Sequence, residues 1–226
     1  AIVQDEGIAI HATNPGNIAG LIALQTSSCH AAPLILPAHP EPASPLPAID
    51  RYLKRDEIIF VHLAEIGQGI ASRQGFGPED LPRIRFINTK TGTPGRTLLD
   101  ALLREQGLDT SQVNGYHQEV HGPHAVAAAI CDGFADAGMC TSGIAHASGL
   151  KFVPVAREDY ELAIRRDLLA ADPRLMSLVA RIQSPAYRSA LQKRGGYDTG
   201  KTGMTRALSA DARLVECPIP ASRKNP

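Results

Sequence analysis

The sequence lacks an excess of charge of either sign, because its 226 residues contain 23 Lys and Arg against 23 Asp and Glu. Nothing in this balance attracts a nucleic acid or an anionic membrane, so electrostatic effects are expected to be local. Long hydrophobic runs are lacking as well. The longest uncharged stretch, from about residue 7 to residue 40, is interrupted by Asn, Gln, Ser, His and Pro, so we expect a soluble protein without membrane insertion.

Closely spaced cysteines are also missing. The four cysteines are Cys29, Cys131, Cys140 and Cys217, and no two of them have C-x-x-C spacing. This pattern indicates neither a zinc site nor a dense disulfide framework, and buried free thiols are expected. The sequence begins without Met and without the charged start and apolar centre of a signal peptide. A mature product and an excised fragment are both consistent with this beginning, which leaves the compartment open.

Strands and helices alternate along the chain, which is typical of an α/β protein. The elements predicted in the first part are a strand over 7–13, a helix over 14–24 and strands over 31–37, 57–64 and 68–73. Asn14 is the predicted N-cap of the first helix. Gly67 and Gly69 are predicted to allow a turn between the last two strands.

The alternation is more regular in the second part. The predicted elements are strands over 83–89, 114–120, 135–140 and 150–156, and helices over 96–107, 123–134, 142–149, 172–183 and 185–194. In the first of these helices, Leu98, Leu99, Leu102 and Leu103 form one apolar face, and Gly107 is the predicted C-cap. Strands that alternate with helices of this length imply right-handed parallel crossovers.

The stretch GGYDTGKTG, residues 195–203, fits the phosphate-loop pattern G-x-x-x-x-G-K-[ST]. That pattern binds phosphates only when a strand precedes the loop and a helix follows it. Here a predicted helix precedes the stretch, and only about two dozen residues follow it. The favoured interpretation is therefore a glycine-rich turn after a helix.

Five ordered motifs resemble a known family. They are FINTKTGTPGRTLLDALL, GYHQEV, HAVAAAICDGFADAG, LKFVPVAREDYELAI and RGGYDTGKTG. In this order and spacing they are similar to the bacterial periplasmic-binding-protein-like domains related to molybdate-binding proteins. The resemblance extends from about residue 14 to residue 203 and is stronger after residue 83. Within it, the 195–203 stretch looks like the closing GGYD turn of the family.

The resemblance implies an α/β fold of the type II periplasmic-binding-protein-like class, with two α/β lobes and an interlobe cleft for a small ligand. It places residues 1–83 and 156–226 in a discontinuous first lobe and residues 84–155 in the second. Relatives serve as solute receptors, which implies a membrane transporter as partner and an extracytoplasmic location. Others are ligand-sensing domains of regulators or parts of molybdenum-cofactor biosynthesis fusions, which implies the cytoplasm. The ligands of the best understood relatives are tetrahedral oxyanions, so molybdate or tungstate is the expected bound group.

Two predicted loop-to-helix junctions agree with an anion site. Each offers backbone N–H groups at a helix start, which carries about half a positive charge. The candidate ligand-binding residues are Asn14, Gly16, Asn17, Thr91, Thr93, Gly95, Arg96, Tyr116 and His124. Arg96 could contact the ligand or form a structural salt bridge. Where relatives commonly read Gly-Ser-Gly-Thr-Arg, this chain keeps a hydroxyl at Thr93, and Pro94 removes one N–H donor.

A histidine-rich segment, YHQEVHGPH over 116–124, suggests a second kind of site. On a strand, His117, Glu119 and His121 would alternate to one face, and His124 would begin the next helix. Such ligands could hold a transition metal. The alternative is that these histidines solvate a loop while Glu119 matches a Glu common in the family.

Catalysis has weaker support in the sequence. No G-x-S-x-G elbow is present, and no cysteine has a recognisable histidine partner. The expectation is therefore a binding protein without chemistry or resident cofactor, with a small hydrolase or transferase on the same scaffold as the alternative. No basic face or helix-turn-helix motif indicates nucleic acid as a partner of this segment.

Overall fold

The computed structural model describes residues 10–11, 17–37, 49, 51–209 and 214–219. The chain forms two compact units. Unit 1 contains residues 1–65, 158–193 and 198–226, and unit 2 contains residues 66–157 and 194–197. Unit 1 is therefore discontinuous and built from both ends of the chain. The units divide at 65/66 and 157/158, whereas the sequence placed the divisions at 83/84 and 155/156.

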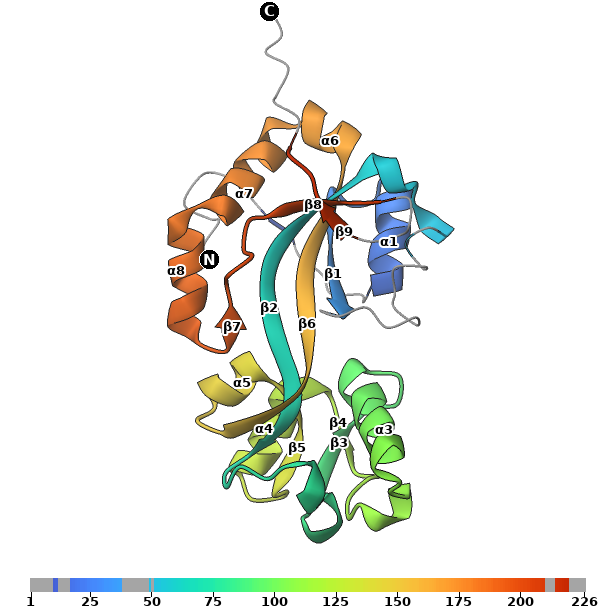
Figure 1. Cartoon of the computed structure of the whole chain (residues 1–226), viewed down its shortest axis with the longest axis vertical. Helices are drawn as coiled ribbons and strands as arrows, with labels where there is room; N and C mark the ends of the chain where they lie inside the picture. Colours follow the sequence, from blue (N-terminus) through green and yellow to red (C-terminus); the bar gives the residue numbers. More distant parts are fainter. Residues whose placement is uncertain (1–9, 12–16, 38–48, 50, 210–213, 220–226) are drawn as a thin grey trace, which may run out of the picture. The chain divides into compact units, whose positions relative to one another are not determined.

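Two long neighbouring strands belong to both units. β2 (Ile58–Ser72) and β6 (Lys151–Arg165) are 15 residues each, and they appear as the two long ribbons in Figure 1. The first part of β2 and the last part of β6 lie in unit 1, and the remaining parts lie in unit 2. Each strand thus contributes to the sheet of both units.

In unit 1 the sheet continues on both sides of these two strands. β1 (Ala31–Pro37) pairs antiparallel with β6, and β8 (Thr205–Leu208) pairs antiparallel with β2. β9 (Leu214–Glu216) pairs with β8. The helices of this unit are α1 (Asn17–Gln25), α6 (Arg166–Ala171), α7 (Pro173–Gln183) and α8 (Pro185–Arg194).

The helices of unit 1 cover both faces of its sheet. Ile58 and Phe60 of β2 pack in one apolar cluster with Leu21 and Leu24 of α1. Ile59 and Val61 belong to a second cluster, with Leu169 of α6 and Leu175, Val179 and Ile182 of α7. Because successive strand residues point to opposite faces, α1 lies on one face and α6 and α7 lie on the other. A strand buried on both sides reads as a continuous apolar run, as IIFV does here.

Unit 2 has a sheet with the order β2-β5-β3-β4. Its new strands are β3 (Phe86–Thr89), β4 (Glu119–Val120) and β5 (Ala137–Thr141), and β3 pairs parallel with both of the others. Its helices are α3 (Pro94–Gln106), α4 (Gly122–Cys131) and α5 (Ser142–Ala147). Leu99, Leu102 and Leu103 of α3 pack on one side, and Val126 and Ile130 of α4 pack with Ala145 of α5 on the other.

The predicted turn at Gly67 and Gly69 is wrong, because β2 is one continuous strand. A side chain at Gly69 would place its Cβ 2.1 Å from the Val153 carbonyl oxygen, and one at Gly67 would lie 3.0 Å from the Phe152 ring. Both contacts come from β6, the neighbouring strand. These glycines therefore permit close packing of backbone rather than a change of chain direction.

The glycine pair after α8 forms a tight turn, as the sequence predicted. Gly195 and Gly196 both have positive φ, 71° and 74°. The Ser142 hydroxyl donates to the Gly196 carbonyl at 2.6 Å and accepts the Gly67 N–H at 3.0 Å. No helix follows Lys201 in the described chain, and the Thr202 hydroxyl donates to the Leu63 carbonyl at 2.9 Å. The phosphate-loop pattern is therefore coincidental.

None of the described helices has the length and apolar character needed to cross a bilayer. All four cysteines are free thiols, with Cys140 buried and the other three half-buried.

We expect Gly196→Ala to lower the melting temperature more than Gly133→Ala. Both glycines have positive φ, which costs an alanine about 1–2 kcal/mol. A Cβ at Gly196 would also lie 2.5 Å from backbone atoms of Gly143, whereas a Cβ at Gly133 meets no atom within 4 Å. Thermal unfolding followed by circular dichroism measures the difference. Equal losses would show that the turn does not pack closely on α5.

Candidate functional site

The carboxyl ends of β3 and β5 are the place in unit 2 where the topology favours a ligand. β3 and β5 are parallel neighbours, with Phe86 opposite Ala137. The chain leaves β3 toward α3 on one face of the sheet and leaves β5 toward α5 on the other. Parallel α/β sheets bind ligands outside the carboxyl ends of strands whose connections diverge in this way.

We call this region the edge site and define it by five residues. They are Thr89, Thr91, Thr93, Gly95 and Thr141. Thr89 and Thr141 are the last residues of β3 and β5 and are buried. Gly95 brings the start of α3 against both strands, since a Cβ there would lie 3.3 Å from Met139 Cβ and 3.4 Å from Thr89 Oγ1.

Thr93 is the N-cap of α3. Its hydroxyl donates to the Lys90 carbonyl at 2.7 Å and accepts the Arg96 N–H at 3.4 Å. The Thr89 hydroxyl oxygen lies 2.7 Å from the Thr93 hydroxyl oxygen. These contacts fix the loop between β3 and α3, so the Thr93 hydroxyl holds the helix start.

The first turn of α3 presents backbone donors. The early N–H groups of a helix have no intrahelical partner, and together they carry about half a positive charge. Pro94 has no N–H, so Gly95 provides the first available amide of the helix. Gly92, with φ of 86°, turns the exposed loop before it. This end of a 13-residue helix therefore favours an anion.

Arg96 has a dense set of partners within unit 2. Its Nε donates to Asp100 at 3.1 Å and its Nη1 donates to Glu119 at 3.0 Å. The guanidinium carbon lies 4.0 Å from the ring centroid of Tyr116, whose hydroxyl donates to Asp100 at 2.8 Å. Burial acts to lower the pKa of Arg96, but the contacts with Tyr116 and Asp100 outweigh it, so that the pKa is raised. Arg96 thus has the structural pairing that the sequence left open, and its contact with a ligand stays a prediction.

We expect Arg96→Lys to lower the free energy of unfolding by about 1.5–3 kcal/mol, the range for losing hydrogen bonds to charged groups. Lysine lacks the planar fork that reaches Asp100 and Glu119 while stacking on Tyr116. Urea denaturation measures the loss. Arg83→Lys, at an exposed position of the same unit, is the matched control and should change stability little. A loss no larger than that of the control would contradict the structural role of Arg96.

Of the first predicted loop-to-helix junction, residues 14–17, the structure describes only Asn17. The Asn17 side-chain amide donates to the Ile35 carbonyl at 2.7 Å and accepts the Ile35 N–H at 2.9 Å. This pair of bonds attaches the start of α1 to β1. Asn14 and Gly16 lie outside the described residues, so their role as ligand contacts stays a prediction.

The histidine-rich segment does not form the predicted long strand. Only Glu119 and Val120 are in β4, and His121 is the N-cap residue of α4. His117 packs edge-on against Tyr116, with ring centroids 5.1 Å apart. His124 lies in the first turn of α4 and is exposed.

Residues 114–117 form turns instead of the predicted strand, because the Tyr116 N–H donates to the Val113 carbonyl, the Gln118 N–H donates to the Gly115 carbonyl, and Gly115 has a φ of 96°. His117 therefore lies in a turn and His121 at the N-cap of α4, so the alternation expected for His117, Glu119 and His121 is not present. The three side chains are not brought together as a group of metal ligands in the described chain.

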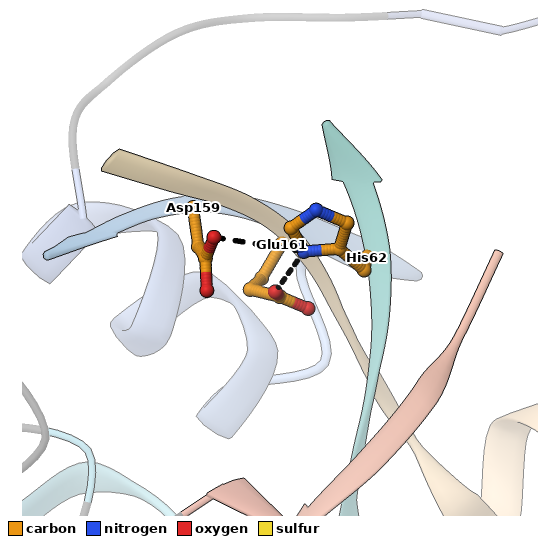
Figure 2. A group of neighbouring side chains, drawn as sticks. All are labelled: His62, Asp159 and Glu161. Carbon is orange, nitrogen blue, oxygen red and sulfur yellow. Dashed lines mark hydrogen bonds and ion pairs between the residues drawn. The ribbon is translucent and has the colours of Figure 1, made fainter. Parts of the chain in front are cut away.

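A different charged cluster lies in unit 1, and the sequence did not indicate it as a site. His62 comes from β2, Asp159 and Glu161 come from β6, and Arg206 comes from β8. Figure 2 shows the first three side chains converging. The available signal was a pair of acids two residues apart inside β6 and a histidine inside an apolar strand. Those positions give no indication that strands about 100 residues apart are neighbours.

The cluster is buried and closely spaced. His62 Nδ1 lies 2.7 Å from Glu161 Oε1 and 4.0 Å from Asp159 Oδ1. Arg206 Nη2 donates to Asp159 Oδ2 at 3.0 Å and also contacts Glu161. Burial lowers the pKa of His62 to about 4, with Arg206 adding to the effect and Asp159 opposing it. The imidazole is therefore neutral at pH 7.

A hollow of about 640 Å³ also lies on unit 1. Its lining residues are Gln25, Arg51, Tyr52, Leu53, Lys54, Glu57 and Arg165. Lys54 pairs with Glu57 at 3.2 Å, and Arg165 pairs with Asp167. Two of the three cations that line the hollow, Lys54 and Arg165, therefore have acidic partners.

The comparison with known proteins gives the family of this two-unit α/β chain. The PBP superfamily domain matches residues 2–183, so the chain belongs to this family. The expected family and the type II periplasmic-binding-protein-like fold are confirmed. The relation to molybdate-binding proteins within the family stays a prediction, as does a cleft between the two lobes.

Among curated sequences, the chain is similar to the uncharacterised protein YvgK of Bacillus subtilis (strain 168). The two are 30% identical over 165 residues, which cover 70% of this chain and 52% of YvgK. The chain thus spans about half the length of that relative.

Two solved structures show the same fold at low sequence identity. A phosphate-bound substrate-binding protein of a phosphate ABC transporter from Clostridium perfringens has a TM-score of 0.55 and 9% identity, covering 81% of this chain and 84% of its own. An ABC-type phosphate transport receptor from Vibrio cholerae has a TM-score of 0.56 and 13% identity, covering 86% of this chain and 90% of its own.

Proposed function

We propose that the protein binds a small anionic solute, a tetrahedral oxyanion such as molybdate, tungstate or phosphate, at the edge site for transport or sensing. The observation that carries the proposal is the start of α3. This 13-residue helix opens directly after β3, at the carboxyl edge of a parallel pair, and Gly95 keeps its first turn against both strands. A helix start in this position is a site for an anion.

The donors of the edge site suit a fully ionised oxyanion. Backbone amides and the Thr141 hydroxyl donate hydrogen bonds without bringing a full charge, whereas the Thr91 hydroxyl donates to Glu119 Oε1 at 3.4 Å and must leave it to reach a ligand. The nearby guanidinium of Arg96 is balanced by Asp100 and Glu119, so its charge is largely compensated before a ligand arrives. Attraction then depends on hydrogen bonds and on the helix dipole, which act over short distances and select for shape.

Binding without chemistry is part of the proposal. The thiol next to the edge site is Cys140, one residue before Thr141. Burial raises the pKa of Cys140 to about 11, so the group is a neutral thiol at pH 7 and a poor nucleophile. This supports a binding protein over a hydrolase or transferase that uses this thiol.

A protein of this family that binds an anion could serve either as a solute receptor or as a sensing domain. Phosphate is bound by the Clostridium perfringens protein and is the ligand named for the Vibrio cholerae receptor, and both share the fold of this chain. A solute receptor would deliver the anion to a membrane transporter. A sensing domain would instead pass the binding signal to another part of a longer protein.

A thermal-shift panel tests the ligand class. Molybdate, tungstate, phosphate, sulfate and small carboxylates are added separately, with sodium chloride matched for ionic strength. A ligand that binds only the folded protein stabilises it by about 2.7 kcal/mol at 100 times its Kd. We expect at least one tetrahedral oxyanion to raise the melting temperature. If none of them does, the proposed function is wrong.

Matched variants locate the effect. Thr141→Val and Thr91→Val remove one hydroxyl each with little change of volume, so we expect the oxyanion-induced shift to shrink while the fold is kept. Thr110→Val, at a half-buried position of unit 2 outside the edge site, is the control. An unchanged shift in both edge-site variants would place the anion elsewhere.

A further inference from the structure

The buried charged cluster of unit 1 has chemistry that the proposed function does not use. His62, Glu161 and Arg206 lie on strand positions that continue the α1-facing side of the sheet, two residues from Phe60, Ala163 and Leu208 respectively. Glu161 is paired in register with Leu34, and Asp159 with Leu36, both buried. Two acids, an imidazole and a guanidinium therefore lie together next to the apolar side chains of β1.

Several polar atoms of this cluster have no hydrogen-bond partner in the described chain. They are His62 Nε2, Asp159 Oδ1, Glu161 Oε2 and Arg206 Nε. The side chains of His62 and Glu161 are 0% exposed and that of Asp159 is 5% exposed. Leaving such atoms unpaired in the interior destabilises the fold, and more so when the group is charged. Asp159 Oδ1 also faces the His62 imidazole, so an unused acceptor points into the cluster.

Two carboxyl groups of the cluster share a single guanidinium, because Arg206 Nη2 contacts both Asp159 and Glu161. Buried charges are normally paired or coordinate a metal. The cluster therefore favours an additional or stronger cation.

The candidate ligand atoms of His62, Asp159 and Glu161 are spaced for a bound cation. One atom from each of His62, Asp159 and Glu161 lies within 4.8 Å of the other two. Nitrogen and oxygen ligands of a tetrahedral zinc ion are each roughly 2.0–2.2 Å from it, and so roughly 3.4 Å from one another. The observed separations from His62 Nδ1, 2.7 Å to Glu161 and 4.0 Å to Asp159, bracket that value.

We propose that His62 Nδ1, Asp159 and Glu161 bind a divalent transition metal such as Zn²⁺ or Mn²⁺, and that the Arg206 guanidinium occupies this position when the metal is absent. An imidazole with two carboxylates is a ligand set for these ions. Coordination through Nδ1 places the imidazole proton on Nε2. This site is distinct from the histidine-rich segment and does not depend on the proposed anion binding.

Arg206 is suited to exchange with a metal. Its side chain is 13% exposed, more than any of the three ligands, and it comes from the four-residue strand β8. Its contacts with His62, Asp159 and Glu161 all go through Nη2, while Nε has no partner in the described chain. A guanidinium held at one nitrogen can leave without breaking a bidentate pair.

The test uses the tag-free full chain, treated with EDTA and then titrated with ZnCl₂ or MnCl₂. Isothermal titration calorimetry and elemental analysis measure stoichiometry, and thermal unfolding measures stabilisation. We expect one equivalent of metal to bind. His62→Gln and Asp159→Asn should abolish this binding, whereas the control substitutions His117→Gln and His121→Gln, in the other histidine-rich segment, should leave it unchanged.

Arg206→Gln provides a gain-of-binding measurement that unfolding cannot mimic. Without the guanidinium the two acids have no cation, so we expect a lower melting temperature that metal restores, together with tighter metal binding than in the wild type. Failure of both the wild type and Arg206→Gln to bind either metal would overturn the proposal. Binding that survives both His62→Gln and Asp159→Asn would overturn it too. The oxyanion panel is scored separately, so either proposal can fail alone.

Discussion

The two strands β2 and β6 impose the constraint on which the rest of the structure depends. Each is 15 residues long, and each contributes to the sheets of both units. β2 is packed on both faces, so nearly every residue of it needs an apolar neighbour or a polar partner. Gly69 shows how tight this arrangement is, because a methyl group there would collide with the Val153 carbonyl of β6. The polar residues tolerated in β2 are therefore informative, and His62 is one of them.

In unit 2, the same parallel order that buries the strands also creates the edge site. β3 and β5 end side by side, and their following helices pack on opposite faces. Acidic partners hold Arg96, whose contact with a ligand stays a prediction. The proposed donors for an anion are the backbone amides at the start of α3 and the Thr141 hydroxyl, since Thr93 donates to Lys90 and Thr91 donates to Glu119. Affinity for an anion in such a site arises from the geometry of many weak donors more than from net charge.

In unit 1, the charged cluster around His62 lies on the otherwise apolar face of the sheet that α1 covers. Leu34 and Leu36 on β1 lower the local dielectric, which strengthens each contact within the cluster and raises the cost of each unpaired atom. Buried charged groups are costly unless they are paired or coordinate an ion. The two proposed sites lie in different units, and the proposed anion site is rich in donors whereas the proposed metal site is rich in acceptors.

The sequence by itself determined the α/β class, the family and the helices with strong local signals. Gly107 is the C-cap that the sequence predicts for α3, and the leucines before it repeat with helical period, whereas the helix begins at Pro94, two residues before the predicted start. Only the tertiary structure decided the contacts between residues that are distant in the chain. Gly67 and Gly69 were predicted to form a turn because local sequence rules do not include the approach of β6. Glu119 was a candidate metal ligand because its partner Arg96 lies 23 residues away in the chain. The pairing of His62 with Glu161 spans 99 residues, and strand order, which no local pattern encodes, brings them together.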